Sequence, residues 1–168
     1  LNTPEKFTEN THNNPSSPYI ASKASSDHLV RAYQRKYCLN ATISNSSNNY
    51  GNNQNTEKFI PSMITKALAG DSLPIYGNGN NVRDWLFVRD HSRAVDLILR
   101  NGRSGETYLV GGNAERSNLN VANKILKIVG KNGSMIQMVP DRPGHDLRYA
   151  VDSSKIEREL GWKREYSF

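Results

Sequence analysis

The chain has 168 residues, which is long enough for one domain with a substantial core. Its 36% hydrophobic and 23% charged residues are typical of a globular protein in water. No apolar run is long enough to predict a transmembrane helix, and LNTPEKFTEN lacks the basic and apolar regions of a secretory signal. The single cysteine, Cys38, excludes an internal disulfide and a cysteine metal cluster. We therefore expect a cytoplasmic protein with no membrane partner and no metal.

The net charge of +6 raises the question of nucleic acid binding. However, Lys and Arg are scattered among Asp and Glu, and no basic run with interleaved aromatic residues is present. A basic surface with a pocket for an anionic ligand is the better interpretation, and no nucleic acid partner is expected.

The first stretch, to about residue 18, is rich in Asn, Thr, Ser and Pro and predicts a loop. A helix is predicted from about Pro18 to Tyr37. Its expected apolar stripe consists of Ala21, Ala24, Leu29, Ala32 and Tyr33. A short strand at Ala41 and Ile43 then leads into SSNNYG.

Helices and short strands are predicted to alternate along the rest of the chain. The clearest helix has apolar residues at 60, 63, 64, 67 and 68 and ends at Gly70. Further helices are expected from an Asp90 N-cap to near Gly102, from a Ser117 or Asn118 cap to Gly130, and from Asp152 to Leu160. The expected strands are LPIYG, GETYLVGG, MIQMV and RYAVD. This alternation predicts an α/β fold.

Tyr19 and Lys23 form a Y-x-x-x-K pattern at the start of the first helix. Residues four apart project from one helix face, so the phenol and the ammonium can converge on one ligand. A nearby cation favours the phenolate, and such a tyrosine can take a proton from a sugar hydroxyl while hydride leaves the same carbon. Taken alone, the pattern is weak, because it occurs by chance in many helices and a solvated tyrosine is then the more common explanation.

The surrounding motifs carry a resemblance to a known family. In chain order they are SPYIASKASSDHLVRAY, SNNYG, EKFIP, LPIYGNGNNVRDWLFVRDH, GETYLVGG, DRPGHDLRY and ELGWK. This series resembles the dTDP-glucose 4,6-dehydratases of the extended short-chain dehydrogenase/reductase family, with SNNYG and DRPGHDLRY as the specific pair. The resemblance implies a partial Rossmann-like sheet in residues 1–52, with the Tyr-Lys helix, and a smaller α/β substrate-binding domain in residues 53–168.

The resemblance also implies roles for individual residues. Tyr19 matches the catalytic base, and Lys23 matches the lysine that binds the nicotinamide ribose of NAD; Asn49 matches a further cofactor contact. The matched substrate contacts are Asn48, Lys58, Phe59, Pro74, Ile75, Tyr76, Arg83, Asn118, Arg142 and His145. Phe59 stands where the family usually has Leu.

Simpler interpretations of these residues remain open. Arg83 and Arg142 can bind phosphate oxygens as a fork, or they can pair with the neighbouring Asp84 and Asp141. His145 can hydrogen-bond its own loop, and Asn48 and Asn49 can be turn residues before Gly51. Trp85 and Tyr149 are expected in the core.

Several family features are not found in these residues. Asn52 and Asn53 replace the usual Pro-Tyr after SNNYG, and neither GNGNN nor the later GG opens a glycine-rich dinucleotide turn. The family's Thr-Asp-Glu segment, which performs the elimination of water, is expected to precede Leu1. The opening in mid-loop and the ending at YSF suggest an excised piece. We therefore expect NAD in the intact family and none bound by this chain alone.

The leading hypothesis is a truncated or split dTDP-glucose 4,6-dehydratase, a lyase by descent, that is inactive in isolation. The alternative is a non-catalytic module for sugar-nucleotide binding or assembly. An epimerase-like relative is disfavoured by DRPGHDLRY. The expected partners are a dTDP-sugar or related nucleotide sugar, and either further copies of the chain or a separate N-terminal half.

Overall fold

The computed structural model describes residues 5–168. Its helices are α1 (Pro18–Tyr37), α2 (Phe59–Ala69), α3 (Val88–Asn101), α4 (Asn118–Ile128) and α5 (Ser154–Leu160), with a short 3-10 turn, η1 (Gly133–Met135). Its strands are β1 (Ile43–Ser46), β2 (Asn48–Tyr50), β3 (Leu73–Tyr76), β4 (Val82–Phe87), β5 (Thr107–Val110), β6 (Glu115–Ser117), β7 (Ile136–Val139) and β8 (Arg148–Tyr149). The predicted α/β class is confirmed.

The strands form three small groups. β1 pairs in parallel with β5, and β3 pairs in parallel with β7. β4 is the central strand of the third group: its second half pairs in parallel with β2, while its first half lies between antiparallel β6 and parallel β8. Because β1 and β2 are almost continuous, one stretch of chain passes from the first group to the third.

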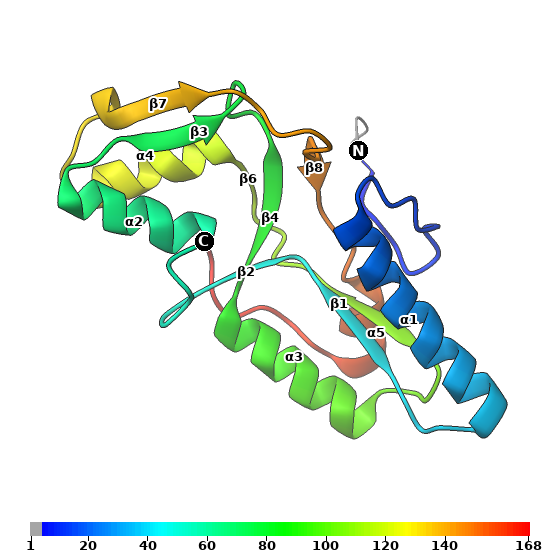
Figure 1. Cartoon of the computed structure of the whole chain (residues 1–168). Coiled ribbons are helices and arrows are strands. Elements are labelled where there is room, and N and C mark those ends of the chain that lie inside the picture. Colours follow the sequence, from blue (N-terminus) through cyan, green and yellow to red (C-terminus); the bar gives the residue numbers. More distant parts are fainter. Residues whose placement is uncertain (1–4) are drawn as a thin grey trace.

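Two hydrophobic clusters divide the molecule. One is formed by α2, β3, the middle of β4 and α4, around Leu73, Ile75 and Trp85. The other is formed by the end of β4, α3, β5 and α5, around Leu86, Tyr108 and Ile156. Figure 1 shows α2, α4, β3 and β7 at one end and α1, α3, α5, β1 and β5 at the other. The body around β1 therefore includes chain from well beyond the expected boundary at residue 52.

The two clusters meet at a buried carboxylate. Asp84 on β4 is fully buried and accepts hydrogen bonds from the main-chain N–H groups of Gly112, at 2.9 Å, and Ala114, at 2.7 Å. A Cβ atom on Gly112 would lie 1.8 Å from the carbonyl oxygen of Trp85. The GG motif after β5 is thus explained by this close approach of two main chains.

Several helix ends lie where the sequence predicts them. α1 has the predicted bounds and is capped by the Ser17 hydroxyl, which accepts from the N–H of Ile20. α2 ends at Gly70, whose φ of 81° is the left-handed conformation that glycine adopts without strain. Ser117, and not Asn118, caps α4 with its side chain.

The predicted Asp90 N-cap is wrong. α3 begins at Val88 with Phe87 as its N-cap, and Asp90 lies in the first turn with its carboxylate buried. That carboxylate accepts from the main-chain N–H groups of Glu165 and Tyr166, both at 3.0 Å. Asp90 therefore holds the C-terminal segment and does not start the helix.

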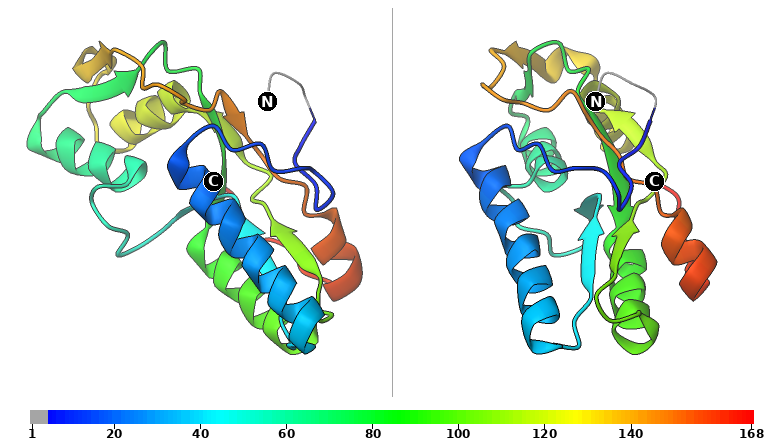
Figure 2. Two further views of the ribbon diagram at one scale, coloured as in Figure 1. Left: turned by 45° about the vertical axis from the view of Figure 1, so that its right-hand side comes forward. Right: turned by 90° about the vertical axis from the view of Figure 1, so that its right-hand side faces the viewer.

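The predicted apolar stripe of α1 is also partly wrong. Leu29 and Tyr33 are 61% and 56% exposed, and Ala32 is exposed as well. No residue of this helix is fully buried. Figure 2 shows α1 standing beside the sheet, with its outer side uncovered. Within residues 5–168, no helix combines the length and the apolar character needed to cross a membrane.

Candidate functional site

A large groove of about 1240 Å³ lies between α1 and the sheet. The side chains of α1 line one wall, and residues 44–48 line another. Arg83 and Tyr149 lie along the same groove, and residues 7–16 complete its border. The residues that line the groove therefore come from stretches that are far apart in sequence: 7–31, 44–48, Arg83, 107–109 and 146–151.

Tyr19 and Lys23 line this groove together, as the Y-x-x-x-K pattern predicts. The Lys23 ammonium lies 5.9 Å from the centre of the Tyr19 ring. Tyr19 is 70% exposed, so its hydroxyl is accessible to a ligand. The phenol and the ammonium therefore face the same groove.

Asn48 and Asn49 are the first two residues of β2, which follows β1 after Ser47. Asn48 lines the groove, and the amide nitrogen of Asn49 donates to the Ser46 hydroxyl at 2.9 Å. The side-chain oxygen of Asn49 is buried and has no hydrogen-bond partner among residues 5–168. A buried acceptor without a donor is costly, so this atom is suited to a donor from a ligand. The nicotinamide end of NAD fits this part of the site, whereas the sequence offers no glycine-rich turn for its diphosphate.

Arg83 is half-buried and anchored to main-chain carbonyls, not to Asp84. Its guanidinium donates to the carbonyl of Val82 at 2.8 Å and to that of Asp146 at 2.9 Å. Burial lowers the pKa of Arg83, and the nearby Asp146 opposes this. Arg83 therefore places a cation at the junction of the groove and the 141–146 loop.

The loop of residues 141–146 forms a second cluster with Tyr76. The His145 ring is hydrogen-bonded to the Asp141 carboxylate at 2.7 Å, which lowers the pKa of Asp141. The Arg142 guanidinium lies 4.7 Å from the centre of the Tyr76 ring, and the His145 ring meets the same tyrosine edge-on at 6.3 Å. The Asp141 carboxylate thus contacts the His145 ring and accepts from the main-chain N–H of Arg142. The Arg142 guanidinium lies on the Tyr76 ring, with Nη2 3.4 Å from Nε2 of His145.

The remaining predicted contacts lie in or beside the first hydrophobic cluster. Phe59 stacks on Trp85, with ring centres 6.3 Å apart, and Lys58 beside it is exposed. Ile75 is completely buried, so only its main chain could reach a ligand, while Pro74 is half-buried. Asn118 is half-buried, and its N–H donates to the carbonyl of Asn81. Nothing in these contacts brings the five residues to the Tyr19 groove.

The predicted core placement holds for Trp85, which is 6% exposed. Tyr149 instead lines the groove, where its hydroxyl donates to the carbonyl of Ser46 at 3.3 Å. Burial, followed by the charge of Asp84, raises the pKa of Tyr149. Its phenol therefore stays neutral and fixes the end of β1.

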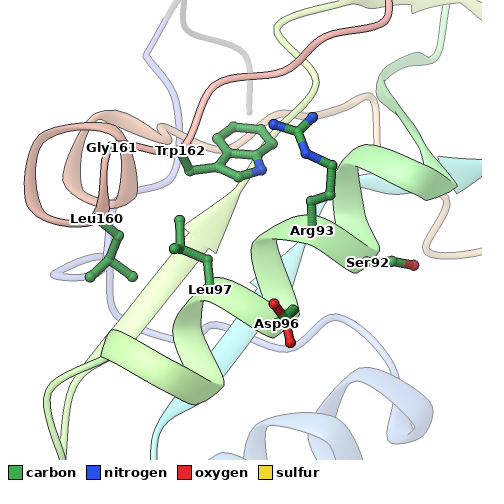
Figure 3. Close-up of a pocket in the computed structure, with 7 residues that line it drawn as sticks. All are labelled: Ser92, Arg93, Asp96, Leu97, Leu160, Gly161 and Trp162. Carbon is green, nitrogen blue, oxygen red and sulfur yellow. The ribbon is translucent and has the colours of Figure 1, made fainter.

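A smaller hollow lies between α3 and the C-terminal segment (Figure 3). Leu97, Leu160 and Trp162 form its apolar floor, and Arg93 stands at its rim. Arg93 is paired with both Asp90 and Glu165 at 2.8 and 2.9 Å. None of the predicted site residues lines this hollow. Its two charged residues, Arg93 and Asp96, already have ion-pair partners.

Sequence reasoning missed several groove residues on α1, among them two that are charged. Asp27 and Arg31 continue the row of Tyr19 and Lys23 at four-residue spacing, and all four line the groove. Their spacing was the signal that could have identified them.

In this chain a parallel strand pair lies beside a helix that carries tyrosine and lysine four residues apart, and this body is joined to a smaller α/β body. The combination defines part of an extended short-chain dehydrogenase/reductase. The family model described as GDP-mannose 4,6 dehydratase matches residues 2–168. The chain belongs to this family.

Individual relatives give a more specific comparison than the family model does. The chain is 52% identical to a dTDP-glucose 4,6-dehydratase of Xanthomonas campestris pv. campestris, over 97% of this chain and 49% of that protein. The structure superimposes on a dTDP-glucose 4,6-dehydratase of Streptomyces venezuelae, solved with NAD bound, with a TM-score of 0.97 and 46% identity, covering 99% of this chain and 52% of that one. A UDP-glucuronic acid 4-epimerase of Bacillus cereus gives a TM-score of 0.93 at 25% identity, over 98% and 53% of the two chains. The chain thus spans about half the length of the relatives it matches.

Proposed function

We propose that this chain supplies the substrate-binding part and the Tyr-Lys pair of a dTDP-glucose 4,6-dehydratase. The observation that carries the proposal is the groove in which Tyr19, Lys23, Asn48 and Arg83 lie together. The much higher identity to the dehydratases than to the epimerase supports dehydration over epimerisation. In this proposal residues 1–52 belong to the dinucleotide-binding body, which β5, α3 and α5 complete.

The residues of the groove suit one half of such a reaction. Tyr19, as a phenolate stabilised by the Lys23 ammonium, takes the proton of the sugar's 4-hydroxyl and becomes a neutral phenol. Asn48 and Asn49 orient the sugar and the nicotinamide end of the cofactor. Bound NAD would supply the acceptor for the hydride that leaves the sugar.

The loop cluster suits the nucleotide. Arg142 presents guanidinium donors beside an aromatic ring, and such donors bind phosphate oxygens in pairs. Arg83 adds a second cation, and Tyr76 offers a ring face to the base or ribose. The diphosphate of a dTDP-sugar matches this combination of charges.

The proposed reaction needs groups that these 168 residues do not supply. These residues contain neither a glycine-rich phosphate turn nor the Thr-Asp-Glu elimination group. Among the described residues β1 pairs on one side only, with β5, and α1 buries no side chain fully. Both features fit a second dinucleotide-binding segment that adds strands beside β1 and covers the groove. Self-association through the outer face of α1, around Leu29 and Tyr33, is a second contact we propose.

The test is reconstitution with a separately expressed N-terminal half of a related dehydratase. The 168-residue chain with NAD and dTDP-glucose should form no 4-keto-6-deoxy sugar, because oriented acid–base groups contribute about 10²–10⁴-fold each. The mixture should form it, and a Tyr19→Phe mixture should not. Turnover by the chain alone would contradict the proposal. Saturable dTDP binding without turnover in any mixture would favour the non-catalytic binding module.

A further inference from the structure

The side of α1 that faces the sheet carries several small and polar residues. Its half-buried positions include Ala21, Ala24, Asp27 and Arg31 beside the apolar Ile20 and Val30, whereas Leu29, Tyr33 and Tyr37 are exposed. No residue of the helix is fully buried, so burial of apolar surface fixes it on the sheet only in part. Something else must determine how α1 is rotated about its axis.

Two directional hydrogen bonds connect this face to the strands. The side-chain amide of Asn45 on β1 donates to the Asp27 carboxylate at 2.8 Å. The guanidinium of Arg31, one turn further along α1, donates to the Thr107 hydroxyl on β5 at 3.0 Å. We call these four residues the polar latch. A hydrogen bond to a charged group is stronger than a neutral one, and both bonds lose strength when their angle changes.

The polar latch lies on the row that carries the predicted chemistry. Tyr19, Lys23, Asp27 and Arg31 are spaced by four residues, and all four line the groove. Asp27 lies about 6 Å along the helix axis from Lys23 and about 12 Å from Tyr19, given the rise of an α-helix. Any rotation of α1 that breaks the Asp27–Asn45 bond also swings Tyr19 and Lys23 across the groove. A shift of about 1 Å at reacting groups can cost about 10²-fold in rate.

We propose that Asp27 and Asn45 are positioning residues, which set the rotation of α1 and thereby place Tyr19 and Lys23 for proton removal. This rests on the proposed function for the rate, but not for the rotation. The polar composition of the interface supports the idea, because a polar contact specifies one arrangement where small apolar residues would allow several.

The Asp27–Asn45 hydrogen bond can be broken by one substitution and restored by a second. Asn45→Asp places two carboxylates opposite one another and breaks the bond. Adding Asp27→Asn restores an amide–carboxylate bond with the donor and acceptor exchanged. Asp27→Asn alone keeps a weaker amide–amide bond and serves as an intermediate if Asn45→Asp folds poorly. Circular dichroism melts of all three variants establish that each is folded.

Two readouts separate rotation from catalysis. In a Cys38→Ser background, nitroxide labels on Ser22→Cys and Asn101→Cys report the position of α1 by pulsed electron paramagnetic resonance. In the reconstituted mixture, kcat and KM for dTDP-glucose report the chemistry. We expect Asn45→Asp to shift or broaden the distance distribution and to lower kcat at least about tenfold, with KM changed less than about twofold. The double exchange should restore the distribution, and kcat to within about threefold of its original value.

The possible results are distinct. An unchanged distance distribution in Asn45→Asp would overturn the proposal. So would a double exchange that restores the distribution but leaves kcat low, since the rotation of α1 would then not control the rate. If the original mixture has no turnover, the proposed function fails, and the distance measurement still decides whether the polar latch sets the rotation of α1.

Discussion

At the scale of single residues, Arg83 and Arg142 each have an acidic neighbour in sequence and pair with neither. Asp84 is buried beneath main-chain N–H groups, and Asp141 accepts from the His145 ring. The Arg83 guanidinium donates instead to the main-chain carbonyls of Val82 and Asp146, and the Arg142 guanidinium lies on the Tyr76 ring. The sequence could suggest both possibilities, but only the packing of distant segments decides between them.

Arg142→Ala should weaken binding of dTDP. The substitution removes charge-assisted hydrogen bonds to phosphate, which contribute about 1.5–3 kcal/mol. Isothermal titration of the variant with dTDP measures this loss directly. Arg158→Ala, on the exposed side of α5, is the matched control and should bind as the original chain does. Equal affinity in the Arg142 variant would remove the loop from the site.

Glu115 should contribute to stability only above acidic pH. Its carboxylate is paired with Arg148 at 2.6 and 2.9 Å, and this hydrogen bonding lowers the pKa of Glu115 more than burial raises it. Because the folded pKa is depressed, the stabilisation is present above the unfolded value, which is about 4.3, and is lost as pH falls through the folded value. Melting temperatures between about pH 5 and pH 3 should therefore fall more steeply for the original chain than for Glu115→Gln. Parallel curves would show that the pair does not contribute.

At the scale of elements, helices with recognisable caps could be predicted, and the strands β2, β4 and β6 could not. Ser17, Gly70 and Gly161 mark helix ends through local chemistry that the sequence displays. β4 contains the charged residues Arg83 and Asp84 in mid-strand, so it lacks a simple alternation of polar and apolar residues. Its pairing with β2, β6 and β8 depends on segments far away in the chain.

The same reasoning explains the errors within predicted elements. Asp90 resembles a cap because aspartate often starts a helix, but main-chain donors at residues 165 and 166 claim its carboxylate. The inner face of α1 was misplaced because its prediction used apolar spacing alone, whereas the inward-facing Asp27 and Arg31 are polar and their partners lie on separate strands. The spacing of apolar residues along a helix does not predict hydrogen bonds to residues that are distant in sequence.

Gly112→Ala should strongly destabilise the fold. Its new Cβ would lie 1.8 Å from the Trp85 carbonyl oxygen, so β4 and the segment after β5 would have to separate. Overpacking of this kind costs about 1–3 kcal/mol and occasionally more. Urea unfolding should show a loss at or above the upper end of this range. Gly133→Ala is the control, because its nearest contact is 3.7 Å away, and it should change the unfolding free energy little.

At the scale of the whole molecule, α1 stands out because it is 20 residues long and none of its residues is fully buried. Leu29 and Tyr33 are exposed on its outer side, and the next turn carries Tyr37, at 60% exposure. These residues form an apolar strip along one helix, which is the kind of surface that binds a partner. We expect the chain to self-associate through this strip.

Light scattering at micromolar concentration should give a mass above 18.9 kDa, the mass of one chain. Leu29→Asp together with Tyr33→Asp should return the mass to that of a monomer, because the charges make burial of the strip unfavourable. Arg35→Asp, at an exposed position of the same helix that lies off the row of residues 29, 33 and 37, is the control and should leave the assembly intact. A monomeric original chain with a cooperative melt would contradict this prediction.

The most direct test of the central claim is a pair of calorimetric titrations of the 168-residue chain, one with dTDP and one with NAD. Tyr76, Arg142 and His145, the cluster that we propose for nucleotide binding, are assembled within this chain, whereas the sequence contains no dinucleotide phosphate turn. We therefore predict saturable binding of dTDP and no saturable binding of NAD over the same concentration range. Saturable binding of NAD without binding of dTDP would contradict the claim that this chain carries the nucleotide-sugar part of a dehydratase site.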